Sequence, residues 1–361
     1  FISKAISYLI RILIFSINNE IMEKEIFQTF LMGMDLIDIL SFIFTLLVQF
    51  YLFSKGQHII RAIIKFSAIF VYLGLTIFLI MITEHYDAVL NALKISLNFN
   101  NFISKANIPP LITVIGSMFT FYSIIILNFG DFSRYVKNKD QLVKGNLTII
   151  LNFILFSFFA ILIVIGSDII LTKNMIEVDR LLTNPNDIIG KIDNTFLTII
   201  VLIFILVASC STNLIANYIP SQNVIINFLP QKLNLNKSGI IITLLAFVVG
   251  MFWLPIISQI GVLSIIDTLG SFFGAMFSVM IIDYFLINKS KIENKDIYSL
   301  EASGSYYYSR GWNIKAAYSI FIGFVFAAST IWNINLNFLQ PFSWLVGAVM
   351  SFITYYLLAK K

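Results

Sequence analysis

Charged residues are scarce in this chain: Asp, Glu, Lys and Arg make up 12% of its 361 residues, whereas an ordinary soluble domain has about 25%. Lys and Arg outnumber Asp and Glu by 24 to 19, but apolar residues dilute this small excess too much for a nucleic-acid surface. The single cysteine, Cys210, excludes a disulfide scaffold. The sequence has no low-complexity tract, which excludes a disordered or collagen-like chain.

Apolar residues take the place of the missing charges. Residues of the Ala, Val, Ile, Leu, Met, Phe, Trp, Tyr and Cys types make up 58% of the chain, more than a soluble protein of this size could bury in one core. They occur in runs of about 20 residues, the length of a helix that crosses a bilayer. The runs are too long for barrel strands and lack their alternation. The sequence therefore predicts an all-α polytopic membrane protein.

The first stretch differs from the others in length. Phe1–Ile17 is apolar and helix-like, but it is too short for a full span and carries Lys4 and Arg11. A signal peptide would be followed by a small-residue cleavage site, which is absent. We therefore expect the stretch to be the end of a helix that starts before Phe1, so that the chain is a fragment.

Nine complete spans are expected after this partial helix, and residues 1–361 are expected to form a single transmembrane domain. Tyr86–Leu97 is expected to be a short surface helix with Leu90, Leu93 and Leu97 on one side. The predicted spans are Leu36–Phe53, Ile59–Ile82, Pro109–Asn128, Leu147–Leu171, Phe196–Pro220, Gly239–Ile257, Ser264–Ile287, Ile314–Ile331 and Pro341–Leu358.

The distribution of cations predicts the orientation in the cell (inner) membrane. If the connection after Phe53 and every second connection after it face the cytoplasm, that side and the carboxyl terminus hold sixteen of the 24 Lys and Arg residues. Cytoplasmic connections are the ones enriched in Lys and Arg. The carboxyl terminus is therefore expected in the cytoplasm.

Carboxylates are expected only at the ends of the spans. Asp131, Asp168, Asp267 and Asp283 all fall there, where water or lipid headgroups are expected to solvate them. A charge at the middle of a bilayer costs several kcal/mol. The cargo at the membrane midplane is therefore expected to be neutral, or a small cation held by neutral oxygens.

One predicted span is unusually polar at its centre, from Ala208 to Asn217. Asn213 and Asn217 are four residues apart and project from nearly the same helix face, with the hydroxyls of Ser211 and Thr212 beside them. Because burying an unpaired amide or hydroxyl costs about 1–3 kcal/mol, the cluster must have partners. It either joins helices to one another or forms a sodium site beside an amide that binds a polar, uncharged ligand.

A second polar stretch lies around Gly116, Ser117, Thr120 and Tyr122. Glycine with small polar neighbours is typical of places where a membrane helix opens and exposes its backbone to a cavity. Tyr122 is then either packed like other aromatic residues or available to stack on a flat ring, since its hydroxyl needs a partner.

Four phrases occur in the order and spacing of one known family. In them the chain resembles the nucleobase:cation symporter-1 family, which includes bacterial hydantoin, allantoin, cytosine and uracil permeases. The phrases are Asn128-Phe129-Gly130-Asp131-Phe132-Ser133-Arg134-Tyr135 after the sixth helix, Ser211-Thr212-Asn213 with Ala216-Asn217 in the eighth, Asp283-Tyr284-Phe285-Leu286-Ile287 with Lys289 at the end of the tenth, and Tyr308 to Gly311 with Asn313, Lys315 and Ala316 before the eleventh.

The resemblance implies a LeuT-type inverted-repeat transporter that imports a neutral nucleobase or related heterocycle by cation symport with alternating access. The family's helices 1, 2 and most of helix 3 would precede Phe1. The implied roles are a partial sodium site of the Ala208 carbonyl, Ser211 and Thr212, and a substrate site of Tyr122, Asn213 and Asn217. Tyr122 stands where many members have a tryptophan that contacts the substrate ring, which leaves substrate choice open.

Other functions are weighed against this one. His58 and His85 lie at span ends, so neither a catalytic triad nor a metal-ligand spacing can be built, and an enzyme is not expected. A channel would need rings of charge or a repeated filter. An amino-acid transporter of the same fold and a non-transporting receptor or scaffold remain alternatives. No cofactor is expected beyond the coupling ion, and the choice between Na⁺ and H⁺ stays open.

Overall fold

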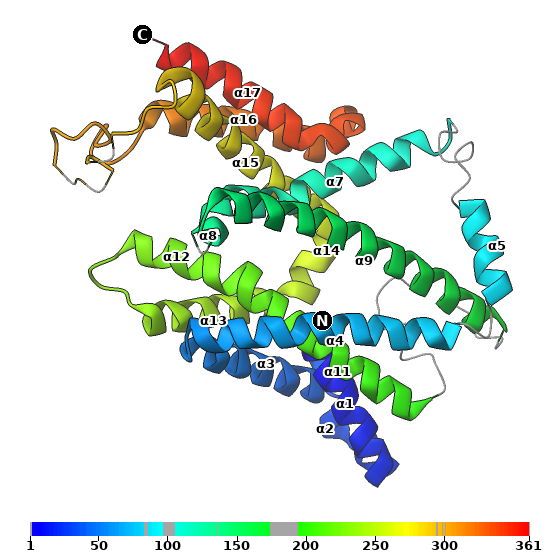
Figure 1. The fold of residues 1–361 in the computed structure, drawn as a ribbon. Helices are drawn as coiled ribbons and strands as arrows, with labels where there is room; N and C mark the ends of the chain where they lie inside the picture. Colours follow the sequence, from blue (N-terminus) through cyan, green and yellow to red (C-terminus); the bar gives the residue numbers. More distant parts are fainter. Residues whose placement is uncertain are drawn as a thin grey trace. The chain divides into compact units, whose positions relative to one another are not determined.

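The computed structural model describes residues 2–82, 86–96, 105–134, 136–173, 194–293, 295–297, 299 and 301–360, and Figure 1 shows its helices in chain order. Eight helices in these ranges are long and apolar enough to cross a membrane. The prediction of an all-α polytopic membrane protein is confirmed. The chain packs as two compact units, one of residues 1–99 and 131–255 and the other of residues 100–130 and 256–361.

The helices of the first unit include those of five predicted spans. Its elements are α1 (Ile2–Ile17), η1 (Asn19–Glu23), α2 (Glu25–Gln28), β1 (Phe30–Leu31), β2 (Met34–Asp35), α3 (Leu36–Ser54), α4 (Gln57–Ile82), α5 (Tyr86–Ser96), α9 (Lys139–Lys173), α11 (Thr195–Asn213), η3 (Leu214–Tyr218), α12 (Ile219–Phe228) and α13 (Leu235–Met251). β1 and β2 form a short antiparallel hairpin.

The second unit contains the helices of the other four predicted spans. Its elements are α7 (Ile108–Leu127), α14 (Ser258–Ile260), α15 (Val262–Ile282), η5 (Asp283–Ile287), α16 (Ile314–Trp332), η6 (Ile334–Phe342) and α17 (Ser343–Ala359), while α8 (Phe129–Ser133) and η4 (Trp253–Ile257) lie at the boundaries of the two units. The span predicted at Gly239–Ile257 corresponds to α13, which has 17 residues, followed by η4.

Short polar side chains determine where several of these helices begin. The Asn194 side chain, for example, accepts a 3.0 Å hydrogen bond from the backbone N–H of Leu197. Such a cap satisfies one of the four backbone N–H groups that lack a partner at a helix start, and is worth about 1 kcal/mol. Side-chain caps of this kind are made by Asp35, Asn194, Asn234 and Asn313.

An ion cluster joins α1 to the start of α3 within the first unit. Lys4 Nζ lies 2.8 Å from Asp38 Oδ2, and Arg11 pairs with Asp35. The Ser7 hydroxyl, which is fully buried, donates a 2.6 Å hydrogen bond to Asp38. Two cations balance the two carboxylates here, which limits the cost of burying the carboxylates.

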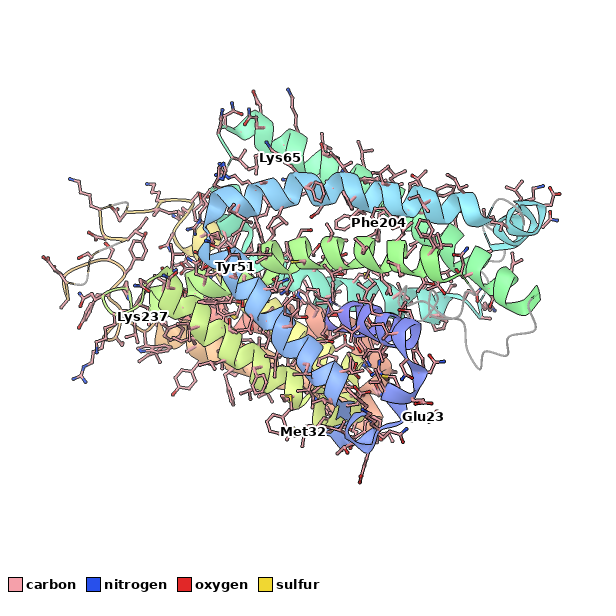
Figure 2. All side chains as sticks on the ribbon, turned by 90° about the horizontal axis from the view of Figure 1, so that it is seen from below. Glu23, Met32, Tyr51, Lys65, Phe204 and Lys237 are labelled. Atoms are coloured by element: carbon pink, nitrogen blue, oxygen red, sulfur yellow. The ribbon has the colours of Figure 1, made fainter. Side chains whose placement is uncertain are left out.

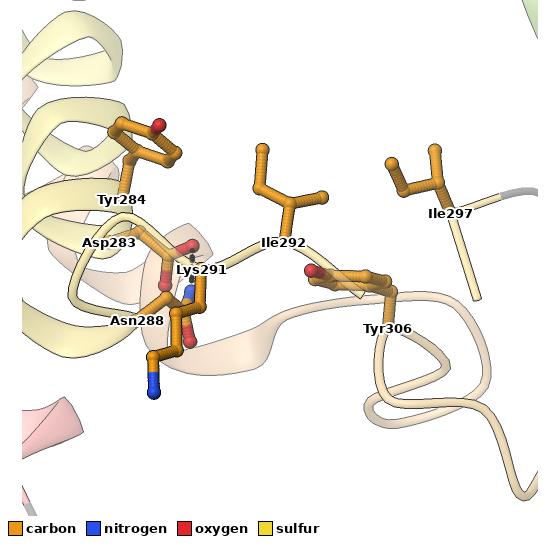
Figure 3. A pocket seen from close by; sticks show the side chains of 7 residues that line it. All are labelled: Asp283, Tyr284, Asn288, Lys291, Ile292, Ile297 and Tyr306. Carbon is orange, nitrogen blue, oxygen red and sulfur yellow. Dashed lines mark hydrogen bonds between the residues drawn. The ribbon is translucent and has the colours of Figure 1, made fainter. Parts of the chain in front are cut away.

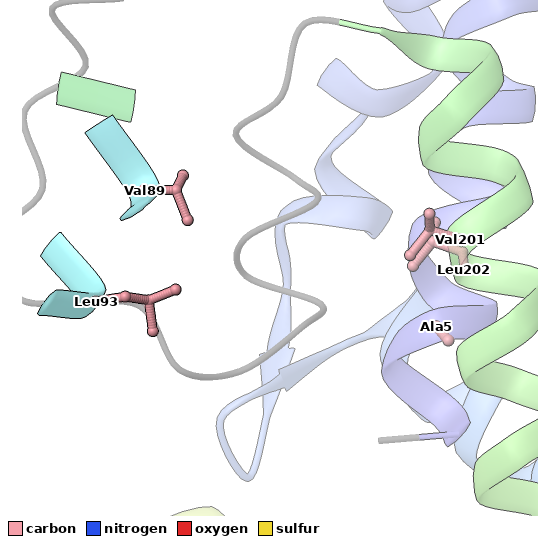
Figure 4. Packing of buried hydrophobic residues seen from close by; sticks show 5 residues of the cluster. All are labelled: Ala5, Val89, Leu93, Val201 and Leu202. Atoms are coloured by element: carbon pink, nitrogen blue, oxygen red, sulfur yellow. The ribbon is translucent and has the colours of Figure 1, made fainter. Parts of the chain in front are cut away.

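An apolar cluster also joins α1 to α11. Ala5 and Leu202 are fully buried and Val201 is 7% exposed, and Figure 4 shows α1 and α11 side by side at these residues. Val89 and Leu93 of α5 are buried in the same cluster. The helix predicted at Tyr86–Leu97 therefore exists as α5. Val89 lies on its buried face with Leu93, whereas Leu90 is only partly buried. Leu97 lies outside the described residues.

Helices α4 and α11 meet through an aromatic contact. The Phe204 ring, labelled in Figure 2, has its centroid 5.3 Å from that of Phe70. A Cβ atom built on Gly74 would lie 2.7 Å from the Phe204 ring. The absence of a side chain at Gly74 therefore allows the ring to lie against the backbone of α4.

Small residues allow the helices of the second unit to approach closely. A Cβ atom built on Gly274 of α15 would lie 2.7 Å from the Trp344 carbonyl oxygen, and one on Gly347 of α17 would lie 2.8 Å from the Ser271 carbonyl oxygen. Lipid provides no hydrophobic force between helices, so close backbone packing of this kind is a main source of their association.

The expectation that α7 opens around Gly116 is wrong, because α7 is one unbroken α-helix from Ile108 to Leu127. A Cβ atom on Gly116 would overlap the carbonyl oxygen of Pro341 in η6. The glycine therefore serves close packing between α7 and η6.

The expectation that solvent surrounds Asp267 is also wrong. Its side chain is buried on α15 and the residue is 5% exposed. One oxygen accepts a 3.1 Å hydrogen bond from Thr120 Oγ1, and the other accepts a 2.9 Å bond from Gln340 Nε2. Partners from α7 and η6 take the place of water, a contact that its position at a span end does not reveal.

Gly116→Ala should destabilise the protein, because the added methyl group would collide with the Pro341 carbonyl and force the helices apart. Overpacking of this kind typically costs about 1–3 kcal/mol. Thermal unfolding in detergent, followed by size-exclusion chromatography, measures the loss. Gly145→Ala is the matched control, because nothing lies within 4 Å of its Cβ position; equal stability of the two variants would contradict the packing role.

Candidate functional site

The polar stretch predicted at Ala208–Asn217 lies where α11 changes its helical form. The α-helix ends at Asn213 and a π-helical turn, η3, follows from Leu214 to Tyr218. The backbone N–H of Leu214 points at the carbonyls of Cys210 and Ser211. π turns inside α-helices occur frequently at functional sites. Here the turn begins directly after Asn213 and contains Asn217.

Three neutral oxygens gather on one turn of α11. The hydroxyl of Ser211 donates a 2.8 Å hydrogen bond to the carbonyl of Ala208, and the hydroxyl of Thr212 donates a 3.0 Å bond to the same carbonyl. Ser211 is buried at 6% exposure, whereas Thr212 is exposed. Each hydroxyl oxygen keeps lone pairs with which it could coordinate a hard cation.

A cavity of about 450 Å³ adjoins these oxygens within the first unit. Ala208, Ser211 and Thr212 line one wall, and residues of α4 and α9 line the others. Tyr72 of α4 donates a hydrogen bond to the Asn152 side chain of α9. The cavity is therefore mainly apolar with a few polar groups, as ligand-binding cavities usually are.

Three carboxamides form a hydrogen-bonded chain beside the oxygens. Gln49 of α3 accepts a 3.2 Å hydrogen bond from Asn213 Nδ2, and Asn213 Oδ1 accepts a 2.5 Å bond from Asn217 Nδ2. Gln49 is 1% exposed, Asn213 is half-buried and Asn217 is exposed. The chain thus runs from the packed interior of the unit to an amide that a ligand can reach.

Gln49 is the site residue that the sequence prediction missed. It also lies 3.4 Å from the Cys210 carbonyl oxygen and 3.1 Å from Cys210 Sγ. An isolated glutamine in the apolar span Leu36–Phe53 was a usable signal, because a buried amide must find a hydrogen-bond partner. The sequence alone did not indicate which other span supplies that partner.

Tyr122 belongs to the second unit, whereas Ala208, Ser211, Thr212, Asn213 and Asn217 belong to the first. Its side chain is half-buried on α7. The ring meets that of Phe121 edge to face, with centroids 5.3 Å apart.

The described residues include no group of three His, Cys, Asp or Glu side chains that could hold a metal ion. The candidate cation ligands are instead the neutral oxygens on α11. Three oxygens provide only part of the several that a hard cation takes, so they fit a partial alkali-cation site.

The first of the four sequence phrases forms a buried polar contact. Asp131 is 8% exposed, so the expectation that water solvates it is wrong. Its Oδ1 atom accepts hydrogen bonds of 2.7 Å from Arg134 Nη2 and from Asn223 Nδ2 of α12. The contact links the end of the phrase to the helix that follows η3; Tyr135 lies outside the described residues.

The last two phrases meet within the second unit, beside a cavity of about 300 Å³ (Figure 3). Asp283 accepts hydrogen bonds from Asn288 Nδ2 at 2.9 Å and from the Tyr355 hydroxyl at 2.6 Å, and Asn313 Nδ2 donates to the Tyr355 oxygen at 3.1 Å. Burial and the Asp283 carboxylate raise the pKa of Tyr308. These bonds join η5 and the N-cap of α16 to α17.

Comparison with known proteins places the chain in a family. A family model for permeases of cytosine and purines, uracil, thiamine and allantoin matches residues 3–358. The chain belongs to this permease family. The resemblance predicted from the four phrases is thereby confirmed, and the members that it resembles are transporters and not enzymes.

The chain aligns with two known permeases over part of its length. It is 28% identical over 240 residues to the allantoin permease of Bacillus subtilis (strain 168), which covers 66% of this chain and 47% of that protein. It is 26% identical over 206 residues to a purine-uracil permease of Arabidopsis thaliana, which covers 57% and 33%. The chain thus spans about half the length, or less, of these permeases. No solved structure matches it.

Asp131→Asn should lower the stability of this permease-family chain, because the charge-assisted bonds from Arg134 and Asn223 become weaker. Hydrogen bonds to charged groups are worth about 1.5–3 kcal/mol each. Thermal unfolding of Asp131→Asn, Asn223→Ala and the double variant forms a mutant cycle. Less than additive losses are expected; strictly additive losses would contradict the contact between the two side chains.

Proposed function

We propose that the protein imports a neutral nucleobase or related heterocycle, of the uracil, cytosine, allantoin or hydantoin class, by cation symport. The observation that carries the proposal is the pairing of three cation-type oxygens on α11 with the exposed Asn217 carboxamide on η3. Membership of the permease family supports the cargo class. One of the two relatives is an allantoin permease and the other a purine-uracil permease.

Asn217 is the proposed ligand-binding amide, with Asn213 supporting it. One N–H of Asn217 is used in the bond to Asn213, which leaves its carbonyl oxygen and second N–H for a ligand. A nucleobase or ureide has an N–H group beside a carbonyl oxygen, so it can pair with both. Tyr122 keeps the role that the family resemblance implies, a ring for stacking on the substrate.

The Ala208 carbonyl, Ser211 and Thr212 are the proposed cation ligands. A bound cation supplies positive charge that holds these oxygens in one arrangement. To coordinate it, the two hydroxyl hydrogens turn away from the cation while their lone pairs face it. Further oxygen ligands are needed to complete the site. Neutral oxygen ligands suit sodium better than they suit a metal that prefers His or Cys.

Cation and substrate are proposed to bind cooperatively, because both sites lie on one helix. Thr212 and Asn213 are adjacent in sequence, so ordering the oxygens also orders the backbone that carries the amides. Each ligand then raises the affinity of the other by the same factor. Alternating access in a LeuT-type architecture would move one helix bundle against another around this site.

An amino-acid transporter of the same fold is the second candidate. A zwitterion carries two full charges, whereas the proposed ligand amide and the oxygens of Ala208, Ser211 and Thr212 are neutral. Competition by nucleobases but not by amino acids separates the two candidates. A receptor would bind without flux. The proposed location is the cell's inner membrane, with the carboxyl terminus in the cytoplasm as the cation distribution predicts.

Asn217→Ala should weaken substrate binding by about tenfold to a hundredfold, because one or two hydrogen bonds to the ligand are lost. Uptake of radiolabelled uracil, allantoin and hydantoin measures this, with the complete gene expressed in cells that lack their own permeases. Asn146→Ala, which alters an exposed asparagine of α9, is the control. Wild-type accumulation of all three compounds in Asn217→Ala would refute the role of the amide.

Thr212→Ala should raise the cation concentration needed for half-maximal uptake, because the site loses an oxygen ligand. Uptake is measured against separate sodium and pH gradients, which also identifies the coupling ion. Thr113→Ala is the control, since Thr113 likewise bonds a carbonyl of its own helix, that of Pro109 at 3.0 Å. An unchanged dependence on both ions in Thr212→Ala would refute the cation site.

A further inference from the structure

Gln49 lies deep within the first unit, and all its side-chain hydrogen bonds cross from α3 to α11. Its Nε2 atom is 3.4 Å from the Cys210 carbonyl oxygen and 3.1 Å from Cys210 Sγ. Its Oε1 atom accepts from Asn213 Nδ2 at 3.2 Å. Both ends of this buried amide are therefore satisfied by α11, within one helical turn of the cation-type oxygens.

The Cys210 carbonyl fixes which way the Gln49 amide points. A backbone carbonyl only accepts hydrogen bonds, so the Gln49 edge that faces it must be the N–H edge. The opposite edge is then the oxygen, which can only accept and requires Asn213 to donate through Nδ2. A reversed Gln49 amide would place its oxygen against the Cys210 carbonyl oxygen in a buried site, at the cost of that hydrogen bond.

The same direction passes along the remaining amides. Because Asn213 donates to Gln49, its Oδ1 atom faces Asn217 and accepts a hydrogen bond from Asn217 Nδ2. The carbonyl oxygen and the second N–H of Asn217 are left on the exposed side. The buried Cys210 carbonyl thus sets the donor and acceptor positions of Asn217, acting through Gln49 and Asn213.

We propose that Gln49 is a positioning residue for Asn217: acting through Asn213, it fixes the orientation in which the Asn217 carboxamide meets a ligand. The inference rests on the proposed function only in taking Asn217 as the ligand-binding amide. Ordering the amide before the ligand arrives lowers the entropy cost of binding. A residue that merely fastened α3 to α11 would affect stability and leave the order of Asn217 unchanged.

The order of the Asn217 side chain tests the positioning role without any ligand. In the complete protein, ¹⁵N relaxation of the side-chain amide, assigned by its loss in Asn217→Asp, should show a rigid group that becomes mobile in Gln49→Met. Methionine keeps the length of glutamine without its polar atoms. Asn213→Ala breaks the chain one step later, without altering α3, and should mobilise Asn217 as well.

Thr45→Val is the matched control, since Thr45 is a buried polar residue of α3 whose hydroxyl bonds only the Ser41 carbonyl of its own helix, at 2.7 Å. It should leave Asn217 rigid. A rigid Asn217 amide in either Gln49→Met or Asn213→Ala would overturn the inference, whatever happens to stability.

Ligand binding provides a second readout, with radiolabelled allantoin and uracil as probes. Gln49→Met and Asn213→Ala should each weaken binding by about fivefold, the equivalent of one neutral hydrogen bond. The double variant should be no weaker than Asn213→Ala alone, because Gln49 acts through Asn213. Independent, multiplying losses would overturn the inference.

The two readouts distinguish failure of the inference from failure of the proposed function. If Asn217 loses its order in Gln49→Met but the wild-type protein binds neither probe, the proposed substrate class is wrong and the positioning role stands. If Asn217→Ala abolishes binding while Gln49→Met changes neither order nor affinity, the substrate site stands and the positioning role is wrong.

Discussion

The requirement that every buried polar group find a partner governs this structure, because membrane-spanning helices have no water beside most of their length. Within the described ranges, the two buried side-chain atoms without a hydrogen-bond partner are Ser41 Oγ and Trp344 Nε1. Gln49 meets the requirement through α11, and Asp267 meets it through α7 and η6. At the site, the same requirement leaves the amide of Asn217 at the exposed end of a satisfied chain.

Local patterns predicted the helices well and their packing poorly. Runs of apolar residues place each predicted span on a helix, since length and hydropathy are properties of neighbouring residues. The role of Gly116 depends on Pro341, far away in the sequence. No local pattern shows that the Pro341 carbonyl occupies the space that a side chain at Gly116 would need. The burial of Asp131 likewise depends on Asn223. Errors therefore fell where a distant partner decides the outcome.

The candidate site divides in the same way. Ser211, Thr212, Asn213 and Asn217 could be selected from the sequence because their spacing on one helix is fixed by the helical repeat. Gln49 could not be joined to them, since it precedes Asn213 by 164 residues and nothing in its own span identifies α11 as its neighbour. The local pattern also did not predict the π turn that follows Asn213.

If the proposed substrate site is right, its lack of charged groups has a consequence for selectivity. A carboxamide can be oriented by one neighbouring carbonyl without any net charge, so its donor and acceptor positions are defined although the surroundings stay uncharged. A charged cargo would have to give up its hydration without an opposite charge to compensate, which costs several kcal/mol inside a membrane. A neutral heterocycle gives up much less and recovers it in directed hydrogen bonds. In the proposed site, the neutral groups of α11 and η3 would therefore discriminate by the cost of desolvation as well as by shape.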